Sequence, residues 1–131
     1  MAVATSTNKT SLLQNANNVQ PDTLRTTFNV TTIAAAGTTQ ATGAQIGNEQ
    51  PFVLISNNTA TNGTVLPTAA YIGQEIAIYP QLVTNAPLTY PPVGGTINSG
   101  TVNAGVATTA RKVTKFIAID RTGLNYVTVG L

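Results

Sequence analysis

The sequence predicts an all-β protein, a jelly-roll-like β-sandwich, and three observations lead to this class. Short segments rich in β-branched and aromatic residues recur along the chain. Gly, Pro and Asn residues interrupt these segments at short intervals. No long window free of Gly and Pro carries an apolar stripe with the period of a helix. Many short strands with such punctuation are typical of sandwiches and barrels, and 131 residues suit a single domain.

The first 25 residues are polar and have neither helical nor strand periodicity. We therefore expect an extended N-terminal arm over residues 1–25 and a β-sandwich domain over residues 26–131. The Leu12 and Leu13 pair allows two interpretations, a frayed terminus or an anchor that lodges in a neighbouring subunit. We see no secretory signal and no apolar run of about 18 residues, so we expect a soluble protein made in the cytoplasm.

The clearest strand signals in the domain fall in five segments, residues 26–34, 50–56, 70–80, 112–120 and 124–130. The first alternates apolar and polar residues, as a half-buried strand does. The second, "QPFVLIS", is a continuous apolar run that predicts burial on both faces. In the third, even-numbered residues from Ile72 to Ile78 share one face. The last two are joined by a turn of hairpin composition at residues 120–123.

Two further segments are rich in turn-forming residues. Residues 34–47, "AAAGTTQATGAQIG", fit either a loop or a poor strand. Residues 88–100, "LTYPPVGGTINSG", contain two prolines and three glycines around a short apolar stretch. This corner has no Lys and no helix is expected after it, so it matches neither a phosphate-binding loop nor a dinucleotide-binding motif. Turn geometry alone explains its composition.

The chain offers few groups for chemistry. It has no His and no Cys, so the commonest general bases, thiolate ligands and thiol nucleophiles are missing. The carboxylates Asp22, Glu49, Glu75 and Asp120 lie in four separate sequence contexts. A glycosidase-type pair would need the fold to bring two of them together. We therefore predict that the protein is not an enzyme and uses no catalytic residue, metal, cofactor or small-molecule substrate.

Charged residues make up 8% of the chain, well below the usual share of about a quarter. Six Lys and Arg residues stand against four Asp and Glu, and the only basic cluster is Arg111, Lys112 and Lys115. Three interpretations of this cluster stay open: the solvated start of a strand, a contact with an acidic protein surface, or a contact with nucleic acid. We expect no nucleic-acid partner, because binding normally needs a longer basic stripe.

The second half of the chain carries an ordered set of motifs. A Leu-Pro pair and a small residue precede a strand that begins with Gly, the corner "YPPVGGTIN" follows, and a final hairpin ends in an aromatic residue. This order resembles a β-domain of structural proteins in tailed bacteriophages. The residues that carry the resemblance are Leu66, Pro67, Ala69, Gly73, Tyr90, Pro91, Pro92, Gly94, Gly95, Ile97 and Asn98. The chain departs from such domains at Tyr79-Pro80, often Asn or acidic there, and at Tyr126, often Trp.

The resemblance implies a homotrimer that binds the major capsid protein on the outside of the phage head, as a decoration or cement protein of the virion. A charge-poor surface fits this expectation, because identical copies or a shell would cover it. Candidate contacts are Leu12, Leu13, Arg111, Lys112 and Lys115, and no membrane is involved. Two alternatives stay open, a tail-fibre or baseplate adaptor module and a carbohydrate-binding β-sandwich.

Overall fold

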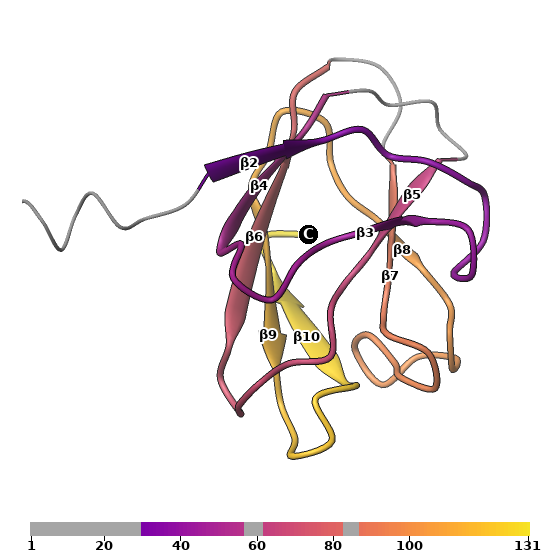
Figure 1. The fold of residues 1–131 in the computed structure, drawn as a ribbon, viewed down its shortest axis with the longest axis vertical. Helices are drawn as coiled ribbons and strands as arrows, with labels where there is room; N and C mark the ends of the chain where they lie inside the picture. The colour runs from indigo at the N-terminus through magenta and orange to yellow at the C-terminus, as the bar shows by residue number, and fades with distance from the viewer. Residues whose placement is uncertain (1–29, 57–61, 83–86) are drawn as a thin grey trace, which may run out of the picture.

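The computed structural model describes residues 30–56, 62–82 and 87–131, which form two packed β-sheets and no helix (Figure 1). The all-β prediction is confirmed. The strands of this part of the chain are β2 (Val30–Ile33), β3 (Ala44–Gln45), β4 (Phe52–Ile55), β5 (Gly63–Val65), β6 (Glu75–Pro80), β7 (Leu88–Tyr90), β8 (Val106–Ala107), β9 (Thr114–Ala118) and β10 (Tyr126–Val129). The predicted arm over residues 1–25 lies outside the described residues.

The two sheets are linked by a chain that crosses repeatedly from one to the other. One sheet has five strands in the order β10-β9-β6-β4-β2, and the other has four in the order β3-β5-β7-β8. From β2 to β7 the chain alternates between the sheets, so β2, β4 and β6 run parallel to one another, as do β3, β5 and β7. A jelly roll is built from antiparallel strands. The jelly-roll detail is therefore not confirmed, whereas the sandwich-like layering is present.

The core lies between the inner faces of the two sheets. On β4 and β6 the residues Val53, Ile55, Ile76 and Ile78 are at most 1% exposed, and Phe116 of β9 is completely buried. The two-residue period of a strand explains this pattern, because every second side chain points inward. Ile46, Leu66, Ile97, Ala118 and Tyr126 complete most of the cluster.

Two details of the strand predictions are wrong. The run 50–56 was expected to be buried on both faces, but Phe52 and Leu54, which point away from the core, are only partly buried. Ile72 was expected to share one face of the strand with Ile76. Instead β6 begins at Glu75, and Ile72 lies 55% exposed in the preceding turn, where Gly73 has a φ of 89°. The positive φ of Gly73 ends the extended conformation before the strand.

The corner at residues 88–100 is a structural junction. Its first three residues form β7, which the sequence had not indicated as a strand. The Asn98 N–H then donates to the carbonyl of Tyr126 at 2.8 Å, and the Tyr126 N–H donates to that of Thr96 at 3.0 Å. A Cβ at Gly95 would overlap the carbonyl oxygen of Leu124, so a larger residue does not fit there. The corner is thus tied to the last strand of the chain.

Tyr126 fixes a second segment to this junction. Its ring is completely buried, and its hydroxyl donates to the carbonyl of Pro67 at 2.7 Å. Burial raises the pKa of the phenol to about 12 from its ordinary 10.0, because the phenolate would lose its hydration. Leu66, just before this proline, lies in the same core cluster. The Leu-Pro motif and the corner motif therefore meet at one aromatic residue.

The turn that joins β9 to β10 forms as predicted. The Asp120 carboxylate accepts hydrogen bonds from the Thr122 hydroxyl at 2.7 Å, the Gly123 N–H at 3.2 Å and the Asn125 side chain. These bonds hold the pKa of Asp120 below its ordinary value, the Asn125 bond most strongly. Gly123 has a φ of 71°, which suits a glycine. Asp120 therefore serves the turn.

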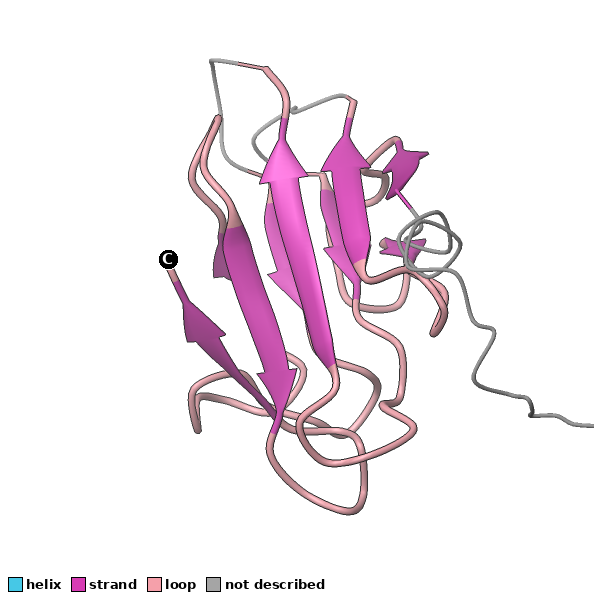
Figure 2. Cartoon of the chain, turned by 90° about the vertical axis from the view of Figure 1, so that its left-hand side faces the viewer, coloured by secondary structure: helices cyan, strands magenta, loops and turns pink. Residues whose placement is uncertain are grey.

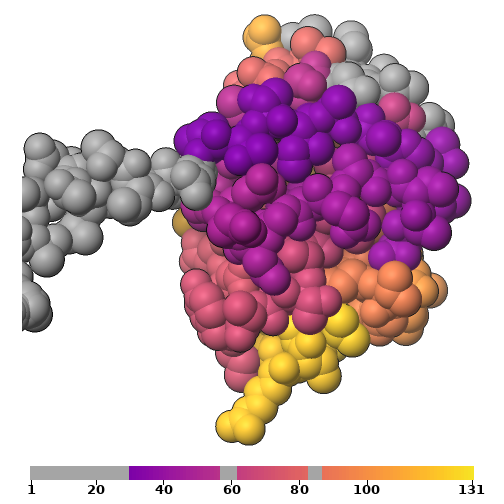
Figure 3. Space-filling view, viewed as in Figure 1, coloured from indigo at the N-terminus to yellow at the C-terminus, as the bar shows by residue number. Residues whose placement is uncertain are grey.

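Residues 34–43 cover the outer face of the four-stranded sheet and form part of one flank of the molecule (Figure 3). The Tyr90 hydroxyl donates to the carbonyl of Thr38 at 2.9 Å, and the Gln40 side chain donates to the carbonyl of Pro91 at 3.2 Å. Gly43 lies so close to Val65 that a Cβ there would come within 2.7 Å of its methyl group. Under this cover Val65 is 1% and Tyr90 is 6% exposed.

Candidate interaction surface

The outer face of the five-stranded sheet carries apolar side chains on all five strands, and Figure 2 views the sheet from this side. We name it the open face. It consists of the side chains that alternate with the inward ones on the five strands, Val30, Thr32, Phe52, Leu54, Glu75, Ala77, Tyr79, Lys115, Ile117, Val127 and Val129. No described segment crosses in front of β9, β6 and β4 in this view.

The strand register arranges these side chains in rows across the sheet. Val30, Phe52, Ala77, Lys115 and Val129 stand opposite one another from β2 to β10. The two ends of this row, Val30 and Val129, are 55% and 56% exposed. One row therefore places four apolar side chains and one cation across the full width of the sheet, with Ala77 at its centre only 8% exposed.

The open face carries one ion pair. The Lys115 Nζ lies 3.5 Å from the Glu75 Oε1, and both side chains are about half exposed, at 51% and 52%. Such an exposed pair contributes little to the stability of a single chain, roughly 0–1 kcal/mol. The rest of the face is apolar apart from the hydroxyls of Thr32 and Tyr79, so its formal charges cancel.

Two shallow hollows adjoin each other on this side of the molecule. The first, of about 260 Å³, is lined by Pro51, Phe52, Glu75, Ala77, Val113 and Lys115. The second, also of about 260 Å³, is lined by Asn48, Glu49, Pro51, Ala70, Tyr71, Gln74 and Glu75. They share Pro51 and Glu75, and the second ends at Tyr71, whose side chain is 65% exposed.

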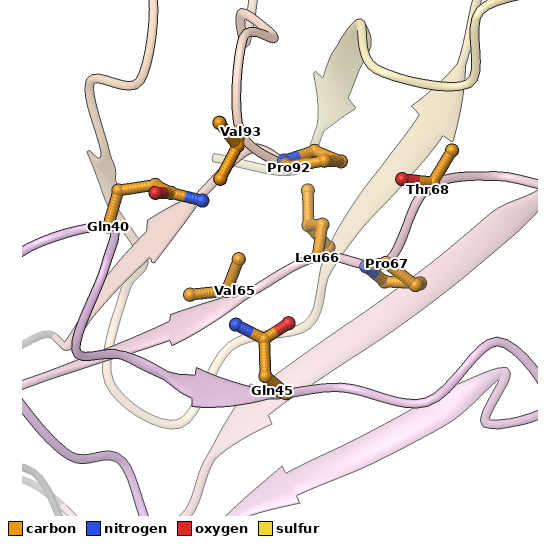
Figure 4. A pocket seen from close by; sticks show the side chains of 8 residues that line it. All are labelled: Gln40, Gln45, Val65, Leu66, Pro67, Thr68, Pro92 and Val93. Atoms are coloured by element: carbon orange, nitrogen blue, oxygen red, sulfur yellow. The ribbon is translucent and has the colours of Figure 1, made fainter.

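A third hollow, of about 250 Å³, lies on the other sheet, between the segment around β3 and the corner (Figure 4). Its walls are Gln40, Gln45, Val65, Leu66, Pro67, Thr68, Pro92 and Val93. The Gln40 amide is engaged with the Pro91 carbonyl, and Pro67 with the Tyr126 hydroxyl. The side chains that line it include no ionisable group, so it offers hydrogen bonds and apolar contact but no acid or base.

The structure separates the predicted contact residues. Arg111 and Lys112 lie side by side in the turn before β9, where the Arg111 N–H donates to the Pro80 carbonyl at 2.8 Å and both side chains are exposed. Lys115 lies on the open face with Glu75. Leu12 and Leu13 are outside the described residues. The basic cluster is thus divided into a pair of cations in a turn and a third cation in an ion pair.

The described carboxylates do not gather into a metal site. Among residues 30–56, 62–82 and 87–131, no group of three His, Cys, Asp or Glu side chains could hold a metal ion. Glu49 and Glu75 line the same hollow, whereas Asp120 lies in its turn. The part of the chain that the structure describes also contains no helix long and apolar enough to cross a membrane.

Sequence reasoning did not find the open face, although a signal for it was present. The strands 75–80, 114–118 and 126–129 carry apolar residues on both of their faces. Apolar residues on both faces of a strand are typical of strands that are covered on both sides in the assembled protein, but only the strand order shows that the outward residues form one surface. Comparisons of the chain with protein-family models, with curated proteins and with solved structures find no match.

Proposed function

We propose that the chain is a structural virion protein, a decoration protein that binds the outside of the head of a tailed bacteriophage as a homotrimer. It stabilises the shell by bridging neighbouring subunits of the major capsid protein. The observation that supports this proposal best is the open face, an apolar sheet surface in a chain with very few charges. Its edge residues Val30 and Val129 are more than half exposed, and apolar side chains gathered on one exposed face are typical of protein–protein contacts.

The residues that resemble phage structural proteins support a scaffold role for their motif. Leu66 and Ile97 lie in the core, and the Pro67 carbonyl accepts the buried Tyr126 hydroxyl. Gly95 is in contact with the backbone of Leu124. Residues of this kind preserve a fold, and the partner is then bound by the more exposed surfaces of the domain.

The turn at Arg111 and Lys112 is our candidate for the contact with the shell. Both cations are exposed, and neighbouring positions in one turn let them approach the same acidic loop. A trimer carries three such turns. Three weak contacts made together hold a protein on a shell far longer than one contact does, because each bound turn raises the effective concentration of the others.

Reconstitution on phage heads tests the proposal. Heads built from the matching major capsid protein and stripped of accessory proteins are incubated with the full chain and imaged. We expect regular density on the outer surface with three-fold symmetry. Bare heads would contradict the proposal, and labelled tails would support the tail-fibre or baseplate adaptor instead.

A charge-reversal pair sharpens this assay. We expect Arg111→Glu to reduce the occupancy of the shell and to lower its sensitivity to salt. Arg121→Glu is the matched control, because Arg121 is an exposed cation in the turn at the other end of β9. Equal losses of occupancy in the two variants would show that net charge matters rather than the Arg111–Lys112 turn.

One observation favours the carbohydrate-binding alternative. The exposed Tyr71 ring borders a hollow with Asn48, Glu49 and Gln74, and sugars stack on aromatic rings beside polar groups. Gln74 is already engaged, because its amide donates to the carbonyl and the side chain of Asn48. Glycan-array binding that is lost in Tyr71→Ala would support this alternative, and an unchanged array signal would exclude a role for Tyr71.

A further inference from the structure

We propose that three copies of the chain assemble through the open face, each turning this face toward a common three-fold axis. The inference rests on the self-assembly in the proposed function but not on binding to a shell. It assigns an interface to a surface that the rest of the described chain leaves uncovered.

The two outer sheet faces show why the open face needs a cover. Residues 34–43 bury Tyr90 and Val65 on the four-stranded sheet. No described segment does the same for the five-stranded sheet, where Val30 and Val129 stay more than half exposed. Water is excluded from apolar surface wherever a partner is available, so this face is the one that gains most from association.

The charges of the open face favour a second copy of the chain as the partner. One Glu and one Lys lie side by side on it, and the other side chains of the face are uncharged. A copy of the same face therefore supplies an opposite charge for each of them. Lys115 of one copy can approach Glu75 of the next across the axis, whereas a purely apolar partner would leave the pair desolvated and incompletely bonded.

The width of the sheet fits three copies. Five strands leave four gaps of about 4.8 Å, so the sheet is roughly 19 Å wide. Three sheets of that width, closed into a triangular prism, hold each sheet centre roughly 5.5 Å from the axis, close to half of the about 10 Å that separates packed sheets. Side chains such as Ile117 and Phe52 can therefore fill the interior of the prism.

The edges of the sheet support a ring. β2 and β10 form opposite edges of the five-stranded sheet, and their outward residues Val30 and Val129 both lie on the open face. In a cyclic trimer the β10 edge of one copy meets the β2 edge of the next. The two valines would then pack together at each corner, and the unpaired backbone groups of both edges would be hidden from other chains.

Sedimentation velocity of the full chain over a wide concentration range tests the interface. We expect the wild type to sediment as a trimer of the 13.5 kDa chain. Ile117→Lys places a second cation in the middle of the open face, opposite Glu75, which already pairs with Lys115, and should weaken assembly by roughly 100-fold or more. Val93→Lys is the matched control, because Val93 is 71% exposed beside the third hollow, and it should remain a trimer.

Charge exchange keeps the test decisive if Ile117→Lys fails to fold. Glu75→Lys and Lys115→Glu alter half-exposed side chains, so each variant should fold, as circular dichroism would verify. Each alone should dissociate, because like charges meet at the axis. The double exchange Glu75→Lys with Lys115→Glu in one chain again places one cation and one anion on each face, so it should restore the trimer.

The outcomes separate this inference from shell binding. A monomeric or dimeric wild type, a trimer that survives Ile117→Lys, or a double exchange that stays dissociated would overturn the interface. Trimers that dissociate as expected but leave phage heads bare would refute the decoration function and leave the interface intact.

Discussion

The outer faces of the two sheets both carry apolar side chains, but these side chains are covered in different ways. On the four-stranded sheet, Tyr90 points outward and is nevertheless only 6% exposed, because residues 34–43 lie over it. On the five-stranded sheet, Val129 points outward and is 56% exposed. The first face is completed within the chain, and the second is completed, on our account, by other chains. Stability should therefore depend on the first face and assembly on the second.

The largest difference in stability should appear when one tyrosine is removed from each outer face in separate variants. Tyr90→Ala deletes a buried ring and should lower the free energy of unfolding by about 3–5 kcal/mol. Tyr79→Ala removes a partly buried ring from the open face and should lower it by only about 1 kcal/mol at low protein concentration. Urea denaturation measures both.

Protein concentration sharpens this comparison. The loss in Tyr90→Ala should be the same at all concentrations, because the ring is buried within one chain. The loss in Tyr79→Ala should grow with concentration, because association stabilises the wild type by mass action. If the loss of unfolding free energy in Tyr79→Ala did not depend on protein concentration, the open face would not be an assembly interface.

A smaller loss of stability should follow when a methyl group is added next to the Tyr90 ring. A Cβ at Gly63 would lie 2.5 Å from a ring carbon of Tyr90, and the ring is held by its bond to Thr38. Gly63→Ala should therefore lower the free energy of unfolding by about 1–3 kcal/mol. At Gly47 the nearest atoms to a Cβ are side-chain atoms at 3.3 Å or more, so Gly47→Ala should be close to neutral when both glycine variants are measured by urea denaturation.

Folding stability should also depend on pH through Tyr126, which lies in the core between the two sheets. The folded chain raises the pKa of Tyr126 to about 12 from 10.0, so above pH 10 the unfolded chain loses this proton first. Stability is complete below pH 10 and falls as pH rises toward 12, with a loss of about 1.4 kcal/mol at pH 11. Tyr126→Phe should lack this part of the alkaline loss. Urea denaturation between pH 9 and pH 11 measures the free energy of unfolding of both proteins. An equal decrease in the wild type and in Tyr126→Phe would contradict a buried phenol.

The same contrast between the sheets governs what the sequence could predict. All five strands of the five-stranded sheet fall in segments that were predicted as strands, because β4, β6, β9 and β10 carry apolar runs or clear alternation. The strands of the four-stranded sheet are two or three residues long. A two-residue period cannot be recognised over that length, and Gly63 and Thr64 give no strong propensity.

The candidate site was harder to predict than the strands. The cations Arg111, Lys112 and Lys115 are adjacent in sequence, yet Lys115 faces Glu75, a partner forty positions away. The parallel order of β2, β4 and β6 follows from crossings between the sheets, which leave no signal in the residues themselves. Without that order, the row from Val30 to Val129 cannot be assembled from the sequence.

The most direct test of the account uses the fact that the chain contains no Cys. A single thiol introduced as Val129→Cys reports on the open face, and one introduced as Val93→Cys reports on the opposite sheet, with both positions well exposed in one chain at 56% and 71%. We expect alkylation of Val129→Cys to be slower by about tenfold or more, since reaction requires access to the thiolate. The difference should vanish when Ile117→Lys is added. Equal rates at the two positions in the otherwise unchanged chain would show that the open face stays in water and would contradict the account.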